Sequence, residues 1–246
     1  MNTYFQFKQF TVHQERCAMK VSTDACLFGA WLAQRGSGHW ALGIRGSGHR
    51  ALDIGGGTGL LSLMLAQAST LYIDAIELER DCFTQMKNNI DASPWASRIG
   101  CIEGDVRQFA FTSRYDFIFS NPPFYEKQLP SPNPSVNAAM HSSMLNLKEL
   151  LQKVSELLTE DGSFAILMPY YRHEELLKTA LLTGLYAQEI CFARHSPKHP
   201  WYRTMVIFRK KAEDVTETSI DIRDTAGGYS EPFTMLMKEY YLNPHP

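Results

Sequence analysis

The sequence predicts an α/β fold in which helices cover both faces of a mostly parallel sheet. From about residue 50, short apolar runs alternate with longer amphipathic runs, as in consecutive βαβ units. Later in the chain, two apolar runs lie too close together for a crossover helix and predict an antiparallel hairpin. The 246 residues suffice for one core with a small appendage. We expect an N-terminal appendage or lid at residues 1–49 and one main domain at residues 50–246.

The expected elements follow from the spacing of apolar residues. The predicted strands are residues 50–54, 71–77, 99–103, 115–120 and 164–169. The predicted helices are residues 60–68, 79–90, 145–158 and 173–182. The hairpin strands are residues 187–195 and 204–210.

The N-terminal segment begins with alternating residues typical of strands and ends in a predicted helix. That helix is expected to begin at Thr23, whose hydroxyl could cap it. Residues 35–44 are nearly repeated as residues 45–54. Only the second copy continues into a glycine-rich turn, so it is the expected strand, and the first copy is interpreted as a loop on the surface.

Composition excludes several classes of protein. The net charge is −2, so any binding of nucleic acid requires a local basic patch. No run of residues is long and apolar enough for a membrane span or a signal peptide, which predicts a cytoplasmic protein. The cysteines are odd in number and form no C-x-x-C pair, so we expect free thiols and no metal site: Cys17, Cys26, Cys82, Cys101 and Cys191. No obligate protein partner is expected.

A glycine-rich turn follows the first predicted strand of the main domain. Asp53 comes just before it, and Gly55, Gly57 and Gly59 alternate with other residues. Glycines at such a turn let a ligand approach the backbone and the N-terminus of the next helix. The spacing does not match the dinucleotide fingerprint, and no Walker lysine follows. The turn therefore predicts a nucleotide-like ligand, unless it is only a tight connection.

Two acids follow the next two strands at the same predicted edge. Glu77 ends one strand, where a carboxylate can accept both hydroxyls of a ribose. Asp105 follows the other and could accept from the amino group of an adenine. The alternatives are a solvated residue at the start of a helix for Glu77 and an N-cap for Asp105. With the turn, the two acids indicate an adenosine site.

The strand at residues 115–120 runs into Asn121, Pro122, Pro123 and Phe124. Proline fixes φ and holds the preceding residue extended, so Asn121 and Pro122 present oxygens that no helix consumes. Two acceptors could bind the hydrogens of a conjugated amine and so orient its lone pair. Phe124 could stack on a base. The alternative is a rigid turn after a strand.

The glycine turn, Glu77 and Asp105 resemble the successive motifs of class I S-adenosylmethionine-dependent methyltransferases. The resemblance implies a Rossmann-like fold with a seven-stranded sheet that ends in an antiparallel hairpin. It implies S-adenosylmethionine as the cofactor, held by these residues: Asp53, Gly55, Gly57, Gly59, Glu77, Asp105, Val106, Asn121, Lys20 and Thr23. Asn121 to Phe124 resemble the motif of enzymes that methylate amide or amino nitrogens, which implies a catalytic role for Asn121, Pro122, Pro123 and Phe124.

Further segments are similar to the bacterial tRNA1(Val) (adenine(37)-N6)-methyltransferase family. These are residues 7–24, 93–96, 120–125 and 229–242. The similarity implies methylation of the adenine beside the anticodon of a tRNA, adenine 37 of tRNA1(Val). Two alternatives remain: methylation of a protein glutamine, which uses a similar motif, and an RNA-binding protein that binds the cofactor without turnover.

A basic run near the hairpin offers modest independent support for an RNA substrate. Residues 194–211 contain no acid, and their aromatic residues could stack on exposed bases. The expected RNA contacts are Arg194, Lys198, Arg203, Lys210 and Tyr125. The alternative is a solvated hairpin face.

Overall fold

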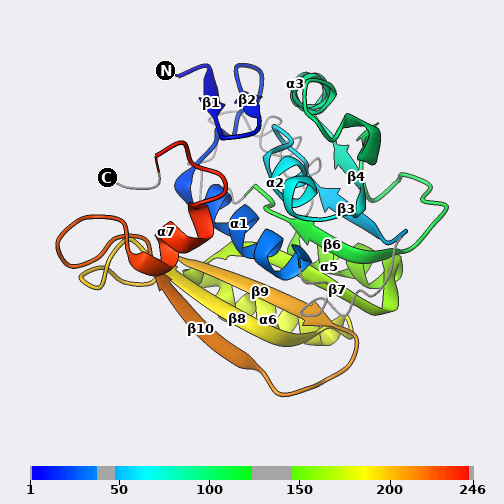
Figure 1. Cartoon of the computed structure of the whole chain (residues 1–246). Helices are drawn as coiled ribbons and strands as arrows, with labels where there is room; N and C mark the ends of the chain where they lie inside the picture. Colours follow the sequence, from blue (N-terminus) through cyan, green and yellow to red (C-terminus); the bar gives the residue numbers. More distant parts are fainter. Residues whose placement is uncertain (1, 38–47, 124–145, 244–246) are drawn as a thin grey trace, which may run out of the picture.

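The computed structural model describes residues 2–37, 48–123 and 146–243 (Figure 1). Within these ranges the main sheet has eight strands in the order β10-β8-β9-β7-β6-β3-β4-β5, and β1 pairs with β2 in a separate small sheet. The strands are β1 (Tyr4–Gln6), β2 (Thr11–His13), β3 (Arg50–Ile54), β4 (Tyr72–Glu77), β5 (Ile99–Glu103), β6 (Tyr115–Ser120), β7 (Leu158–Pro169), β8 (Tyr186–Arg194), β9 (Arg203–Arg209) and β10 (Thr216–Asp221).

Five of the six α-helices in the described ranges match predicted helices, and the short helix after the last strand was not predicted. They are α1 (Thr23–Ser37), α2 (Leu60–Ala68), α3 (Arg80–Asp91), α5 (Leu147–Leu157), α6 (His173–Leu182) and α7 (Glu231–Met237), with short 3-10 turns η1 (Ala96–Arg98) and η2 (Tyr170–Arg172). A capping box explains where α5 begins: Asn146 accepts from the Glu149 N–H, and Glu149 reaches back to the Asn146 N–H.

The main sheet is parallel except at β9, which alone among its described strands runs against its neighbours β7 and β8. The predicted parallel sheet and antiparallel hairpin are thus confirmed. The sheet has one strand more than the seven expected, because β10 pairs in parallel with the outer edge of β8. We did not predict β10, because most of its residues are exposed and polar and no apolar run marks it.

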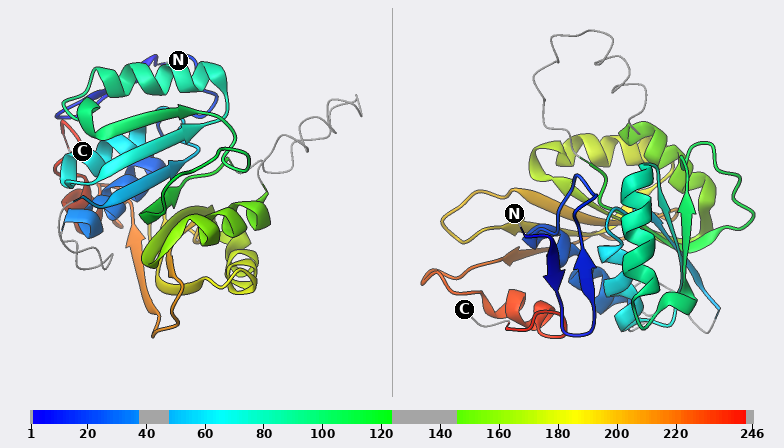
Figure 2. Two further views of the ribbon diagram at one scale, coloured as in Figure 1. Left: turned by 90° about the vertical axis from the view of Figure 1, so that its right-hand side faces the viewer. Right: turned by 90° about the horizontal axis from the view of Figure 1, so that it is seen from above.

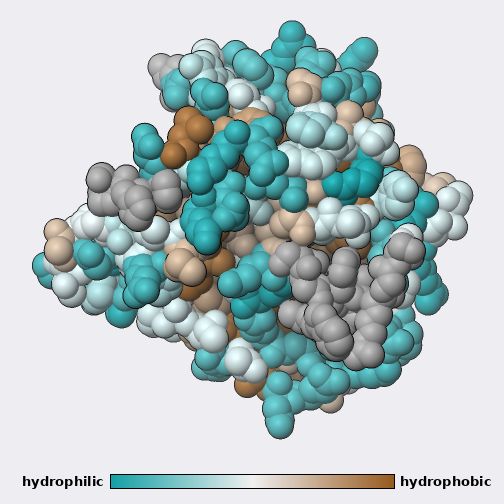
Figure 3. All heavy atoms as spheres, in the orientation of Figure 1, coloured by the Kyte–Doolittle hydropathy of each residue, from teal (hydrophilic) through white to brown (hydrophobic). Residues whose placement is uncertain are grey.

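Helices cover both faces of the sheet (Figure 2). Successive side chains of a strand point to opposite faces. In β6, Phe117 and Phe119 therefore join the core beneath α1, α2, α3 and α7, whereas Ile118 joins the core beneath α5 and α6. The face shown in Figure 3 is largely hydrophilic with scattered apolar patches.

The N-terminal segment packs into the larger core. Phe28 and Trp31 of α1 are fully buried there. The predicted helix from Thr23 is confirmed, but the capping hydroxyl belongs to Ser22, which accepts the Ala25 N–H at 3.4 Å. The division at residue 49 stays a prediction, and the first copy of the repeat lies largely outside the described residues. None of the helices in the described ranges is long and apolar enough to cross a membrane.

Candidate functional site

The glycine turn between β3 and α2 presents bare backbone on one side. Gly55 and Gly56 donate their N–H groups to the carbonyl oxygen of Ile76 at the end of β4, at 2.9 and 3.0 Å. Gly55 has φ +75°, and a Cβ built there would meet no atom within 4 Å. A Cβ on Gly56 would lie 2.4 Å from Sδ of Met86 in α3. The turn is therefore packed on one side and open on the other.

Positive φ recurs at the next glycines of the turn. Gly57 has φ +57° and Gly59 has φ +83°, a conformation that side chains rarely adopt. Gly59 is the N-cap of α2 and supplies no side-chain hydrogen bond to that helix end. A glycine at this cap leaves the first N–H groups of α2 without a side-chain cap, an arrangement that suits an electron-rich ligand atom.

Asp53 precedes the turn by two residues and is fully buried. Its Oδ2 accepts the Ser62 hydroxyl at 2.7 Å, whereas Oδ1 has no hydrogen-bond partner among the described residues. Burial chiefly, and the nearby charge of Glu77, raise the pKa of Asp53 to about 7, against the opposing hydrogen bond from Ser62. A buried carboxylate with one oxygen unpaired would be stabilised by a cationic ligand.

Glu77 lies at the carboxyl end of β4, mostly buried, and is held by backbone. Its Oε2 accepts the Gly57 N–H at 2.8 Å, and its Oε1 accepts the Glu79 N–H at 2.9 Å. No cationic side chain of the described residues forms an ion pair with Glu77 or Asp53. Each carboxylate oxygen of Glu77 keeps a second lone pair, so a ligand hydroxyl could still donate to it.

Asp105 follows β5 at the same edge, in a different setting. The Arg107 guanidinium donates to both of its oxygens, and its Oδ1 also accepts the Arg107 N–H at 2.9 Å. The hydrogen bond from Arg107 is the largest effect on the pKa of Asp105 and lowers it. Arg107 is 3.3 Å from Glu149 of α5. Asp105 therefore caps a turn at residues 106–108 and not the helix that the N-cap alternative expected; Val106 beside it is buried.

Asn121 lies next to the glycine turn because β3 and β6 are neighbours. Asp53 of β3 is in register with Phe119 of β6. The Ser120 hydroxyl donates to the Ile54 carbonyl at 2.7 Å, which fixes the two strand ends together. Asn121 and the first glycine come directly after these residues, at the carboxyl edge of strands about 5 Å apart. The structure thus brings together the two motifs that the sequence had separated.

Of the asparagine motif, the structure describes Asn121, Pro122 and Pro123. Asn121 and Pro122 are partly buried, and Pro123 is exposed. The Asn121 Nδ2 lies 3.8 Å from Sδ of Met19, which comes from the N-terminal segment. The predicted contacts at Phe124 and Tyr125 lie outside the described residues.

Lys20 and Thr23 were expected near the cofactor, and the structure gives Lys20 a local partner instead. Its ammonium donates to the carbonyl oxygens of Gln14 and Cys17, the latter at 2.7 Å. It thereby braces the loop at residues 14–22. Thr23 is the first residue of α1. Their proposed contact with the cofactor stays a prediction.

The basic residues of the hairpin separate into two groups. Arg194 and Arg203 lie at the carboxyl edge, where they pair with Asp221 and Asp24 at 2.5 and 2.6 Å. Lys210 lies beyond the other end of β9, about 20 Å away by strand geometry, and donates to the Leu158 carbonyl at 3.0 Å. The run of residues 194–211 contains no acid, but acids from other segments neutralise part of it.

Lys198 lies in the loop between β8 and β9, at the carboxyl-edge end. Its ammonium is 3.5 Å from the Thr225 carbonyl. Three of the predicted RNA contacts thus gather at one edge, and Lys210 does not join them.

An aromatic cluster at this edge includes residues that sequence reasoning did not select. Tyr170 and Tyr171, in the turn after β7, are 38% and 66% exposed. The Arg194 guanidinium lies 4.3 Å from the centroid of the Trp201 ring, and His195 stacks on Tyr202 at 4.3 Å. The sequence analysis considered only the aromatic residues between β8 and β9. Tyr170 and Tyr171 were missed because they follow a different strand, β7.

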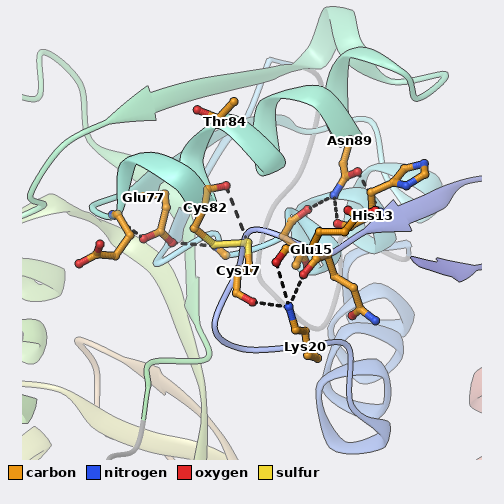
Figure 4. The surroundings of a disulfide bond; sticks show 12 residues. His13, Glu15, Cys17, Lys20, Glu77, Cys82, Thr84 and Asn89 are labelled. Atoms are coloured by element: carbon orange, nitrogen blue, oxygen red, sulfur yellow. Dashed lines mark hydrogen bonds between the residues drawn. A yellow bond between two sulfur atoms is a disulfide. The ribbon is translucent and has the colours of Figure 1, made fainter. Parts of the chain in front are cut away.

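The expectation that all five cysteines are free thiols is wrong. Cys17 and Cys82 are joined in a disulfide beside Glu77 and the loop braced by Lys20 (Figure 4). Their separation of 65 residues hid the pair, because only the packing of the N-terminal loop on α3 brings them together. Cys26, Cys101 and Cys191 are free, as expected. In the ranges that the structure describes, no group of three His, Cys, Asp or Glu residues could hold a metal ion.

Comparison with known proteins agrees with the resemblance to methyltransferases. Residues 19–183 match the family model of the methyltransferase small domain. A tRNA1(Val) (adenine(37)-N6)-methyltransferase of Tolumonas auensis is 37% identical over 97% of this chain and 96% of its own. The protein of the same name from Phocaeicola vulgatus is 35% identical over 98% of this chain and 99% of its own.

Solved structures support the same fold. A predicted O-methyltransferase from Agrobacterium tumefaciens superposes with a TM-score of 0.64 at 15% identity, covering 88% of this chain and 96% of that one. A putative RNA methyltransferase from Pyrococcus horikoshii has a TM-score of 0.55 at 17% identity, covering 76% and 81%. A glycopeptide N-methyltransferase in complex with S-adenosylmethionine has a TM-score of 0.53 at 12% identity, covering 74% and 87%.

Proposed function

This chain belongs to the family of tRNA1(Val) (adenine(37)-N6)-methyltransferases, and from that premise we propose which reaction it catalyses and how its residues take part. It transfers a methyl group from S-adenosylmethionine to the N6 amino group of an adenine in tRNA, namely adenine 37 of tRNA1(Val). The observation that carries the proposal is the adjacency of the open glycine turn and Asn121 on the neighbouring strands β3 and β6.

The residues at the turn fit S-adenosylmethionine. Gly55 leaves an open backbone surface for a close approach, and Asp53 offers a buried unpaired oxygen to a positive charge. Glu77 can accept from ribose hydroxyls with its remaining lone pairs. When bound, the cofactor supplies an electrophilic methyl group on a sulfonium. We assign to Asp53, Gly55, Gly57, Gly59 and Glu77 the task of holding and orienting it.

Asp105 and Val106 would hold the adenine end of the cofactor. Asp105 already accepts three hydrogen bonds from the Arg107 guanidinium and one from the Arg107 N–H, so an adenine amino group would have to replace one of them. The guanidinium keeps Asp105 ionised and therefore ready to accept. These bonds use the two lone pairs of each carboxylate oxygen, so the ligand contact requires the Arg107 side chain to give up one of its bonds.

Asn121 and Pro122 would hold the amine that is methylated. The lone pair of an N6 amine is delocalised into the purine, so the nitrogen is a poor nucleophile until its geometry changes. The Asn121 side-chain oxygen and the Pro122 carbonyl can accept the two hydrogens and turn the lone pair toward the methyl group. Orientation and proximity then supply most of the catalysis, because a sulfonium methyl is already reactive. Stacking of the target base is assigned to Phe124, and Tyr125 to RNA contact.

The RNA surface that we propose is the carboxyl edge beside the hairpin. Arg194, Lys198 and Arg203 converge there, and Trp201 and Tyr171 offer ring faces. Cations would contact phosphates and rings would stack on bases that a single-stranded loop exposes. Because Asp24 and Asp221 offset two of the arginines, stacking is expected to contribute more to binding here than net charge does. We expect a cytoplasmic enzyme that needs no obligate protein partner.

The test of this function is a transfer assay with labelled S-adenosylmethionine. Separate reactions contain transcribed tRNA1(Val), the same tRNA with guanine at position 37, ribosomal RNA, DNA and cellular protein. The expected result is label in N6-methyladenosine from the unchanged tRNA alone. Label in protein glutamine would replace this function by the protein-directed alternative.

Asn121→Ala supplies the control for catalysis in the same assay. It is expected to bind S-adenosylmethionine while losing nearly all methyl transfer. If the wild-type protein binds both cofactor and tRNA and transfers nothing, the chain is a binding protein and the enzymatic proposal fails.

A further inference from the structure

The disulfide lies between two segments that both border the proposed cofactor site. Cys17 is 2% exposed in the N-terminal loop, and Cys82 is 9% exposed in the first turn of α3. Their Cα atoms are 4.6 Å apart. Nothing in the proposed reaction uses either sulfur. This separation lies within the range that a disulfide bond spans, so the two cysteines can be joined while the loop is packed on α3.

The loop that carries Cys17 is held together by hydrogen bonds between its own residues. Lys20 ties the carbonyl oxygens of Gln14 and Cys17 together, and the Val21 N–H donates to the Gln14 side chain at 2.8 Å. Met19 of the same loop reaches Asn121. Any movement of Cys17 therefore moves the loop that touches the proposed acceptor corner.

Cys82 lies near Glu77, the residue proposed to bind the ribose of the cofactor. Cys82 follows Glu77 by five residues, and the intervening Glu79 N–H donates to Glu77. Figure 4 shows the disulfide between the loop and the start of α3, beside Glu77. One covalent bond thus joins the loop at the acceptor corner to the segment that positions the ribose acid.

We propose that Cys17 and Cys82 form a reversible oxidation site that controls how fast the cofactor exchanges. The inference rests on the proposed function, since it takes the glycine turn and Glu77 as the cofactor site. With the bond formed, the loop is tied over this edge, and both entry and release of ligand are slow. With the thiols free, only noncovalent contacts hold the loop in place. The loop then opens readily, and exchange of the cofactor is fast.

The co-reactant belongs to the class of small disulfides, such as glutathione disulfide. The thiolate of one cysteine attacks it, forms a mixed disulfide and releases one glutathione thiolate. The second cysteine thiolate then attacks the mixed disulfide, forms the Cys17–Cys82 bond and releases the second glutathione. Two cysteine thiols are oxidised, one glutathione disulfide is reduced, and the two thiol protons pass to the two glutathione thiolates. In the cytoplasm, protein disulfides are mostly transient and respond to redox state.

Burial connects the oxidation to ligand binding. Sulfurs that are 2% and 9% exposed must be uncovered before a small disulfide can reach them. A bound cofactor that keeps the loop closed should therefore protect the pair from oxidation, and also from reduction once it is bonded.

The test measures dissociation of S-adenosylhomocysteine from the full-length protein, by stopped flow against excess unlabelled competitor. Protein treated with glutathione disulfide is compared with the same protein treated with a thiol reductant, and free thiols are counted in both. We expect two thiols fewer after oxidation, a peptide containing the 17–82 bond by mass spectrometry, and a dissociation rate at least fivefold lower. Reductant should restore the fast rate.

Variants separate this bond from other effects of oxidation. Cys17→Ser and Cys82→Ser should dissociate at the fast rate under both treatments, whereas Cys101→Ser, which removes an unpaired thiol, should retain the response. Equal rates for oxidised and reduced wild-type protein, or five thiols after oxidation, would overturn the inference. Failure of S-adenosylhomocysteine to bind in either state would instead contradict the proposed function.

Discussion

The amino edge of the main sheet pairs its acids with cations, whereas the carboxyl edge leaves two acids without any. At the amino edge, Asp74 accepts from Arg50 at 2.6 Å and from the Tyr115 hydroxyl at 2.8 Å. At the carboxyl edge, Asp53 and Glu77 form no ion pair with the described residues, and one oxygen of Asp53 is unpaired.

The pairing of acids distinguishes the two edges of the sheet: the amino edge stabilises the fold, and the carboxyl edge is the proposed ligand site. A buried or half-buried carboxylate is costly unless a cation or hydrogen bonds compensate it. The amino edge meets that cost within the protein. At the carboxyl edge, hydrogen bonds compensate Glu77 and one oxygen of Asp53, whereas the second oxygen of Asp53 has no partner among the described residues and could be stabilised by a ligand with a positive charge.

The largest expected effect is at the acceptor corner. Asn121→Ala should lower methyl transfer by about 10³-fold, since it removes an acceptor that orients the amine. Affinity for S-adenosylmethionine should change less than threefold, measured by calorimetry. A transfer rate within tenfold of wild type would show that Asn121 does not orient the amine. The carboxyl edge would then lose its proposed role in catalysis.

Glu77→Gln should weaken cofactor binding by about 10- to 100-fold, because hydrogen bonds to a charged acceptor contribute about 1.5–3 kcal/mol. The rate of transfer at saturating cofactor should fall much less. Equilibrium binding of S-adenosylhomocysteine is the measurement. The backbone bonds from Gly57 and Glu79 make Gln a better choice than Ala, since it keeps an acceptor for one of them.

The aromatic cluster should matter for RNA rather than for cofactor. Trp201→Ala should raise the KM for tRNA about tenfold, as loss of one base-stacking contact predicts. Trp201→Phe should recover most of it. Lys210→Ala, at the opposite edge, should leave the KM for tRNA within twofold. A larger effect at Lys210 than at Trp201 would place RNA on the other edge.

Binding of the cofactor should depend on pH through Asp53. Its pKa of about 7 means that the free protein holds a proton there below neutrality, and a cationic ligand favours its loss. Affinity for S-adenosylmethionine should therefore rise several-fold from pH 6 to 7 and level off above. Calorimetry in buffers of different ionisation enthalpy should detect a released proton, and Asp53→Asn should abolish the release.

The same raised pKa has a consequence for stability. Between about pH 4 and pH 7 the unfolded chain has lost the Asp53 proton that the folded protein retains, so stability falls as pH rises through that range. Denaturant unfolding of Asp53→Asn, compared with wild type, should show a shallower decline.

The smallest effect on function is expected at the amino edge. Asp74→Asn should reduce the free energy of unfolding by about 1–2 kcal/mol, since it removes the charge that pairs with Arg50 and weakens the Tyr115 contact. Cofactor affinity and methyl transfer should stay within twofold. A loss of cofactor binding without a loss of stability would show that the two edges are not separated in this way.

Much of the fold was predictable because its elements carry local signals. The apolar run and glycines around β3 and α2, and the proline pair after β6, mark their own boundaries through backbone restrictions. By contrast, β10 was missed because an exposed edge strand has few apolar residues. The capping of α1 by Ser22 in place of Thr23 is a shift of one residue, within the usual uncertainty of helix ends.

The candidate site was predictable as a set of residues and less so as a set of contacts. Glu77 and Asn121 could be chosen because strands of a parallel sheet deliver their carboxyl ends to one edge. The pairing of Arg203 with Asp24, and of Asp105 with Arg107, changes how much charge each offers to a ligand. Such partners come from side-chain packing, and for Arg203 from a segment far along the chain.

By itself the sequence determined the order of strands and helices from β3 to β9, the glycine turn and the asparagine corner, since each depends on backbone preferences within a few residues. The tertiary structure decided which charges are paired, which end of β9 faces the proposed RNA surface, and that Cys17 meets Cys82. These depend on contacts between distant segments, and no local pattern of residues specifies which distant surfaces will pack together.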